Sequence, residues 1–304
     1  MHGGRDTKSL PDGAPLAALV LGNVALAFGP VFVRHADVGP VAAGFWRIAL
    51  AIPFLLLLCP LARQPIPRIA PRLLGFVALG GLCFAADLAS WHIGILQTTL
   101  ANATLFGNSA TLFFPIYGFL IARAWPSRTQ GTALLMALIG AGLLMGRSAS
   151  LSHAQLIGDL LCLLAGVLYT GYFVVMARAR GTLQPLPVLA ISTIASAPPL
   201  LLLFALVLGE RIIPADWTPL IGLALASQVL GQGLMTYALG RLSPLVVGIG
   251  LLIQPIVAAL AGWGWYAEIP GPLDFVGAGL VAVALVLVRR APRERLAPQV
   301  ATVE

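Results

Sequence analysis

Long apolar stretches alternate with short polar connections along nearly the whole chain. Most of them approach or exceed the roughly 20 residues that an α-helix needs to cross a bilayer. The pattern therefore predicts an all-α integral membrane protein with ten transmembrane helices. The expected helices cover residues 14–33, 40–62, 73–96, 98–121, 129–146, 156–177, 186–209, 218–239, 243–266 and 271–288.

Composition supports the membrane assignment. Hydrophobic residues make up 59% of the chain and charged residues 10%, which is more apolar surface than a soluble domain can bury. The three cysteines are isolated within expected helices and lack the spacing of metal ligands, so packing is their expected role. We expect neither a bound metal nor a cofactor.

The distribution of positive charge predicts the topology. With the N-terminus in the cytoplasm, 14 of the 18 lysines and arginines fall on the cytoplasmic side, as the positive-inside rule requires. We expect a bacterial inner-membrane protein, monomeric or homodimeric, with cytoplasmic tails at residues 1–13 and 291–304. The net charge of +7 then reflects this orientation and contact with anionic lipid. A nucleic-acid partner is not expected.

The chain is expected to divide into two five-helix halves, at residues 14–146 and 156–290. Residues 28–32 can be aligned with 169–173, and 113–116 with 253–256, at similar offsets. Because five is odd, the second half must enter the membrane from the opposite side. Inverted repeats of this kind occur in many secondary transporters, where substrate binds near the midplane and access alternates between the two sides.

Four residues within or near the ends of expected helices are candidate hinges, because proline frees backbone groups and permits bending. The alternative is that these residues only shape helix packing. The candidates are Gly29, Pro30, Pro115 and Pro255.

Three ionisable side chains lie deep in the expected helices, where charge is costly and marks a partner or a functional site. Arg47 and Asp87 are at similar depths on neighbouring helices, so we expect an ion pair between them. In the alternative, Asp87 is the site for a proton or a cationic substrate. His92 is either a hydrogen-bonded structural residue or a proton relay.

Uncharged polar and aromatic residues are distributed over several expected helices. Amides supply donors and acceptors that suit a zwitterionic ligand, and aromatic rings supply flat apolar walls with cation–π attraction for ammonium groups. The alternative is that the amides join helices to one another. The candidate substrate-binding residues are Asn23, Trp91, Asn102, Tyr169, Tyr172, Gln228, Gln232 and Tyr237.

Several short motifs resemble the EamA-type proteins of the drug/metabolite transporter superfamily. Residues 29–34 with 39–40 and Arg47 resemble the opening of these proteins, and residues 158–166 resemble the start of their second repeat. Residues 102–115 and 243–255 resemble their fourth and ninth helices. The resemblance covers about residues 14–290 and is greatest to aromatic amino-acid exporters of the YddG type.

The resemblance implies a small-molecule carrier, since characterised relatives move amino acids, other small metabolites or drugs, usually outward. We expect export of hydrophobic or aromatic amino acids. The alternative cargo is a cationic drug-like or nucleobase-type compound, with Asp87 as the coupling site. An intramembrane enzyme is a remote alternative. The chain lacks a His-Glu-x-x-His motif, paired aspartates and acidic clusters for Mg²⁺, so we expect no enzymatic activity.

Overall fold

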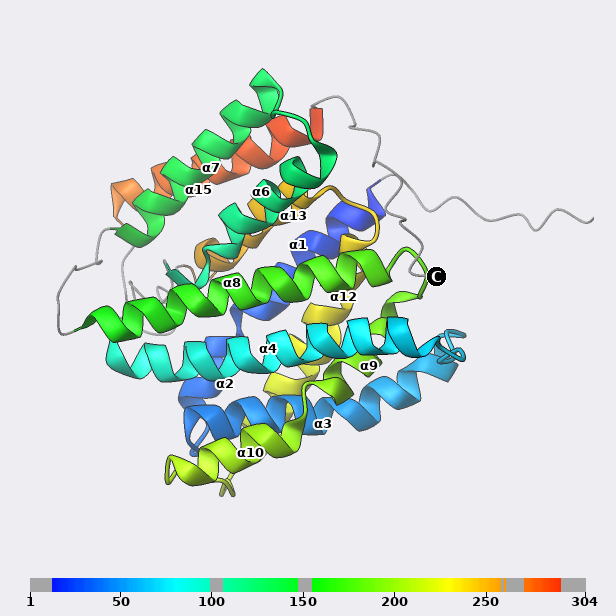
Figure 1. Ribbon diagram of the computed structural model, residues 1–304. Helices are drawn as coiled ribbons and strands as arrows, with labels where there is room; N and C mark the ends of the chain where they lie inside the picture. The colour runs from blue at the N-terminus through cyan, green and yellow to red at the C-terminus, as the bar shows by residue number, and fades with distance from the viewer. Residues whose placement is uncertain (1–12, 99–105, 147–154, 258–259, 261–270, 291–304) are drawn as a thin grey trace, which may run out of the picture.

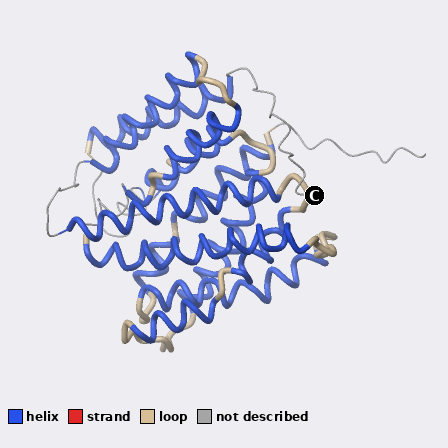
Figure 2. Tube along the Cα trace, in the orientation of Figure 1, coloured by secondary structure: helices blue, strands red, loops and turns tan. Residues whose placement is uncertain are grey.

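The computed structural model describes residues 13–98, 106–146, 155–257, 260 and 271–290. Throughout these residues the regular secondary structure is helical (Figures 1 and 2). The elements are α1 (Ala14–Ala27), α2 (Gly29–His35), α3 (Pro40–Leu61), α4 (Pro71–Gln97), α6 (Ala110–Ala122), α7 (Arg128–Gly146), α8 (Leu156–Ala179), α9 (Pro185–Ala195), α10 (Pro198–Val207), α11 (Thr218–Gly222), η2 (Leu223–Gly231), α12 (Gln232–Leu239), α13 (Pro244–Leu251) and α15 (Pro272–Arg290).

The helices have the length and composition of a membrane protein. Six segments are long and apolar enough to cross a bilayer, and three shorter apolar helices accompany them. The predicted helical membrane fold is therefore confirmed. The count of ten helices stays a prediction, because residues 99–105, 258–259 and 261–270 lie outside the described residues. Residues 1–12 and 291–304 of the expected tails lie outside them too.

Several of the predicted helices are not continuous α-helices in the structure. The segment at 186–209 breaks between α9 and α10, where Ala197 has a φ of +47° and the two following prolines have no N–H to continue the helix. The segment at 14–33 breaks at Phe28, between α1 and α2. The segment at 218–239 is π-helical from Leu223 to Gly231, between α11 and α12, and π-helical turns are frequent at functional sites.

The predicted hinge residues lie beside such interruptions or close contacts. Gly29 and Pro30 begin α2 directly after the break at Phe28. Pro115 lies inside α6 against Gly248, where an added Cβ would come within 2.5 Å of the Pro115 Cγ atom. Pro255 follows a turn at residue 252 that ends α13. Their role as hinges stays a prediction.

Helix packing repeats between the two halves of the chain. α4 packs along α8 in the same way that its counterpart in the second half, η2 with α12, packs along α1. Likewise, α4 contacts α9, and η2 contacts α3. Three further contacts join counterparts directly: α3 with α9 and α10, α6 with α13, and α7 with α15. In Figure 1, α7 and α15 lie side by side at one end of the molecule and α3 and α10 at the other, with α4 and α8 between them. The arrangement is that of two related repeats.

Small residues allow α7 and α15 to pack closely against each other. Ala137 and Ala141 are buried against a cluster that includes Val281 and Ala284. A Cβ added to Gly140 would come within 2.7 Å of the Gly277 carbonyl oxygen. These small residues therefore pack α7 and α15 against each other.

The two repeats cap each other's helices. The Glu210 carboxylate, just after α10, accepts the backbone N–H groups of Val41 (3.2 Å) and Ala42 (2.8 Å) at the start of α3. Just after α3, the Gln64 side chain accepts the N–H of Leu186 (3.2 Å) at the start of α9. Each helix therefore begins where its counterpart ends, so α3 and α9–α10 run in opposite directions.

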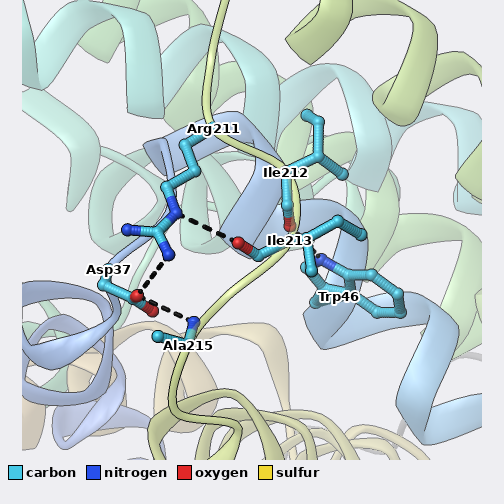
Figure 3. A network of polar contacts seen from close by, with 6 residues as sticks. All are labelled: Asp37, Trp46, Arg211, Ile212, Ile213 and Ala215. Carbon is cyan, nitrogen blue, oxygen red and sulfur yellow. Dashed lines mark hydrogen bonds and ion pairs between the residues drawn. The ribbon is translucent and has the colours of Figure 1, made fainter.

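The Glu210 cap belongs to a wider contact between the α2–α3 and α10–α11 connections (Figure 3). Asp37 pairs with Arg211 (3.1 Å) and accepts the N–H of Ala215 (2.8 Å). The Trp46 indole N–H donates to the Ile212 carbonyl oxygen (2.8 Å). Because the ion pair is largely exposed, it adds little stability, and its consequence is to fix the relative position of the two connections.

Replacing Glu210 by alanine is expected to destabilise the protein by about 1 kcal/mol, the usual cost of removing a helix N-cap. The carboxylate also lies at the positive end of the α3 dipole, so Gln64→Ala, which removes a neutral cap from α9, should cost less. The measurement is the thermal unfolding midpoint of the purified protein in detergent. Equal midpoints for Glu210→Ala and wild type would contradict this account of the cap.

Candidate functional site

Polar and aromatic side chains from several helices meet where α3, α4, α8, α9 and the η2–α12 segment pack together. On α4, Phe84, Asp87 and Trp91 follow at intervals of three and four residues and so lie on one face. On α8, Tyr169 and Tyr172 follow the same rule. Since α4 and α8 pack along each other, these two faces form the walls of one cluster.

The wall on α8 is a continuous set of rings. Phe84 stacks on Tyr172 with ring centroids 4.8 Å apart, and Tyr169 lies 4.2 Å from Phe173. Tyr169 and Tyr172 are nearly parallel at 6.0 Å. Phe114 of α6 extends the set by an edge contact to Phe173 at 5.5 Å. Such pairs contribute about 0.5–1.5 kcal/mol each beyond their buried area, so the rings stabilise one another's positions.

Arg47 reaches the cluster from α3. Its Nε–H group donates to the Gln228 side-chain oxygen (3.2 Å), and its guanidinium carbon lies 5.4 Å from the centre of the Phe84 ring. Gln228 in turn donates to the Thr193 hydroxyl (3.2 Å) of α9. The arginine is thus held by a neutral amide and an aromatic face, a cation–π arrangement.

Asp87 is not in contact with Arg47. In the part of the chain that the structure describes, an ion pair joins Asp37 to Arg211, and none joins Arg47 to Asp87. The two charges are still close enough to interact electrostatically. The expected contact pair is therefore absent from this conformation, in which the Nε–H of Arg47 donates to Gln228 on η2.

The two glutamines have different partners. Gln228 and Gln232 are four residues apart, and both are buried. The Gln232 side-chain N–H donates to the Tyr169 hydroxyl (3.0 Å), while its side-chain oxygen has no hydrogen-bond donor among the described residues. Gln232 therefore offers an unused acceptor beside the aromatic wall.

Asn23 joins helices in this conformation. It is fully buried, donates to the Leu19 carbonyl oxygen (2.8 Å) and accepts from the Gln254 side chain (2.8 Å). Its amide also donates to the Met235 sulfur (3.4 Å). These contacts join helices, and a role of Asn23 in substrate binding stays a prediction.

The other predicted residues lie at the edge of the cluster or beyond it. Trp91 and His92 have ring centroids 5.2 Å apart, and the buried His92 ring lies against Gly44. Tyr237, near the end of α12, lies under the Arg241 guanidinium, 4.2 Å from it. Asn102 lies outside the described residues. Trp91 is the member of this group that shares the α4 face with Asp87.

A second set of arginines lies at the ends of α8 and α12, away from the cluster. Arg178 donates to the Tyr117 hydroxyl (2.9 Å), and Arg180 donates to the Thr236 carbonyl oxygen (3.0 Å). Burial, helped by the neighbouring Arg241, lowers the pKa of Arg180 to about 10. This pKa keeps the side chain charged at neutral pH, so the cytoplasmic end expected from the charge pattern carries a group of cations.

Sequence reasoning missed Phe84, Phe173 and Thr193. Phe84 had a signal, because it precedes Asp87 by three residues and so shares its helical face. Phe173 adjoins the predicted Tyr172. Thr193 had no signal, since its contact with Gln228 depends on how α9 packs against η2.

Comparisons with known proteins agree with this architecture. The model of the EamA-like transporter family matches residues 14–146 and 156–290. The pseudopaline exporter CntI of Pseudomonas aeruginosa is 23% identical over 76% of this chain and 77% of its own. An uncharacterized transporter of Archaeoglobus fulgidus is 24% identical over 90% of this chain and 96% of its own.

A solved structure gives independent support for the fold. A protein crystal structure superposes with a TM-score of 0.73 at 16% identity, covering 90% of this chain and 94% of the other. The sequence relatives support the expected family and an exporter. They do not include an aromatic amino-acid exporter of the YddG type, so that narrower resemblance gains no support from them.

Proposed function

Because the chain belongs to the EamA-like transporter family, we propose that it is a secondary transporter of the inner membrane that exports small amphipathic metabolites by alternating access. Hydrophobic or aromatic amino acids are the first cargo of this proposal. The family and the exporter among its relatives make the chain a multi-pass membrane transporter and not an enzyme. Cargo, direction and the cytoplasmic termini belong to the proposal.

The observation that carries the proposal is the mixed cluster between the two repeats. Aromatic rings of α4 and α8 form an apolar wall, while Arg47, Asp87 and Gln232 supply charge and hydrogen-bonding groups around it. A binding site for an amphipathic solute needs both kinds of surface. Its place between the repeats is where secondary transporters bind substrate.

The arrangement of the repeats supports alternating access. The reciprocal caps of Glu210 and Gln64 make the second helices of the two repeats antiparallel, as an inverted repeat requires. The breaks in the helices at Phe28 and Ala197 supply points at which helix segments can reorient. The same breaks support the predicted hinge roles of Gly29 and Pro30.

A cationic drug-like or nucleobase-type cargo is the second candidate, and Asp87 favours it. Among the described residues this carboxylate has no ion-pair partner, so it is open to a cation. In that case Asp87→Asn would abolish transport of an organic cation and leave Arg47 dispensable. An amino-acid carrier of the kind proposed would need both residues.

Export can be tested in cells fed with dipeptides that release a single amino acid in the cytoplasm. Cells expressing the protein should excrete phenylalanine or leucine several-fold faster than cells with an empty vector. Cells expressing Arg47→Gln to a similar level should match the empty vector. Equal excretion with and without the wild-type protein, across aromatic and branched amino acids, would refute the amino-acid proposal.

A further inference from the structure

Arg47 and Asp87 present opposite charges to the same aromatic wall from different helices. Arg47 lies over the Phe84 ring, and Asp87 follows Phe84 by one helical turn on α4. Both charges are close enough to interact electrostatically with each other and with Tyr169. They are nevertheless separate in the structure, so each is available to a third group.

Arg47 has unused hydrogen-bonding capacity. A guanidinium carries five N–H donors, and within the described residues only the Nε–H group meets an acceptor, the Gln228 oxygen. Among the described residues the Nη groups meet none. A guanidinium fork binds a carboxylate bidentately and with roughly twice the strength of a neutral hydrogen bond. The bond to Gln228 and the Phe84 ring hold the fork in place without neutralising it.

The Asp87 carboxylate also has unused hydrogen-bonding capacity, as an acceptor. Its half-buried carboxylate, deep in α4, accepts no hydrogen bond from any residue that the structure describes. A charge in this position is costly unless it is paired. On α12, the Gln232 side-chain oxygen is a second acceptor beside the aromatic wall, because it has no donor among the described residues while the amide N–H of the same side chain is bound to Tyr169. Acceptors of this kind suit an ammonium group.

We propose that Arg47 and Asp87 are the two poles of the substrate site, so that the cargo is a zwitterion. Its carboxylate binds the Arg47 guanidinium, its ammonium binds the Asp87 carboxylate, and its apolar part lies against the half-buried Tyr169 ring. The assignment rests on the proposed transport function and narrows it to α-amino acids and compounds that carry the same pair of charges.

Charge balance selects a zwitterion over either single ion. A bound cation would satisfy Asp87 and leave Arg47 unpaired and repulsive, while a bound anion would do the reverse. A zwitterion pairs both groups at once, and the occupied site has no net charge. Leaving one buried charge unpaired costs more than the pair itself gains. The site should therefore discriminate against ligands that lack either charge.

Binding to the purified full-length protein in detergent tests the assignment without requiring transport. The ligands are phenylalanine, phenylalanine amide, which lacks the carboxylate, and N-acetylphenylalanine, which lacks the ammonium; isothermal titration gives the Kd. Wild type should bind phenylalanine at least tenfold more tightly than either analogue. Asp87→Asn should lose the preference over N-acetylphenylalanine and keep the preference over the amide. Arg47→Gln should do the opposite.

Two variants are matched controls. Arg178→Gln removes an arginine bound to Tyr117, and Asp159→Asn changes a carboxylate that accepts from Thr98; both should keep the wild-type preferences.

If the neutral variants of the two poles do not fold, Arg47→Lys and Asp87→Glu should keep both preferences with weaker binding. The assignment would be overturned if wild type bound all three ligands with equal affinity. It would also be overturned if Asp87→Asn and Arg47→Gln each weakened the binding of all three ligands by the same factor. Tight zwitterion binding without transport would refute the proposed function and leave the site assignment standing.

Discussion

Replacing Gly81 by leucine is expected to leave almost no folded protein. Gly81 lies on α4 where it crosses α9, and an added Cβ would come within 2.3 Å of the Ser192 carbonyl oxygen and 2.9 Å of the Ser196 nitrogen. These are backbone atoms, so no side chain can move aside, and the helices would have to separate. Overpacking of a tight interior costs about 1–3 kcal/mol even where side chains can adjust, and small residues are what allow helices in membranes to approach this closely.

The same helix offers a matched control. Gly75 of α4 has no atom within 4 Å of an added Cβ, so Gly75→Leu should fold as wild type does. The measurement is the yield and elution profile of both variants in size-exclusion chromatography after detergent extraction. A monodisperse Gly81→Leu protein at wild-type yield would show that α4 and α9 are not packed as described.

Replacing Gln228 by leucine is expected to reduce transport roughly 10- to 100-fold in a protein that still folds. The side chain accepts the Arg47 Nε–H and donates to Thr193, so leucine removes the neutral group that positions the guanidinium. Hydrogen bonds to charged groups contribute about 1.5–3 kcal/mol, and each 1.4 kcal/mol corresponds to about tenfold in an equilibrium. Because Gln228 acts through Arg47, the effect should appear mainly as a higher KM for substrate.

Gln130→Leu is the control for this substitution. Gln130 is also buried, but it accepts the Ser127 N–H (2.8 Å) at the start of α7, away from the cluster. Its loss should lower the unfolding temperature and leave KM unchanged. A Gln228→Leu protein with wild-type KM and maximal rate in proteoliposomes would show that Arg47 does not depend on Gln228 for its position.

Local pattern was sufficient to predict most of the helical regions. Long apolar runs and prolines at the first helical positions, such as Pro40, Pro71 and Pro185, mark where helices begin. The break at Ala197 could have been anticipated from the two prolines that follow it. The π-helix from Leu223 to Gly231 could not, because its sequence reads equally well as an α-helix and packing selects between them.

The candidate site was predictable in its members and less so in its contacts. Tyr169 and Tyr172 were identified as aromatic walls, and they lie in the cluster with Arg47 and Asp87. The depths of Arg47 and Asp87 along their helices predicted that the two charges lie close together. The direction of the Arg47 guanidinium could not be predicted, because it depends on the position of Gln228 on η2. The Glu210 cap could not be predicted either, because nothing in the sequence around a loop carboxylate indicates that it caps a helix starting 169 residues earlier.

The central claim, that this chain carries hydrophobic or aromatic amino acids, is tested most directly by counterflow in proteoliposomes with no imposed membrane potential or pH gradient. Vesicles preloaded with unlabelled phenylalanine or leucine should transiently accumulate the labelled compound above its equilibrium level, and protein-free vesicles should not. Exchange of an organic cation or a nucleobase, with none of any aromatic or branched amino acid, would contradict the account and make Asp87 alone the centre of the site.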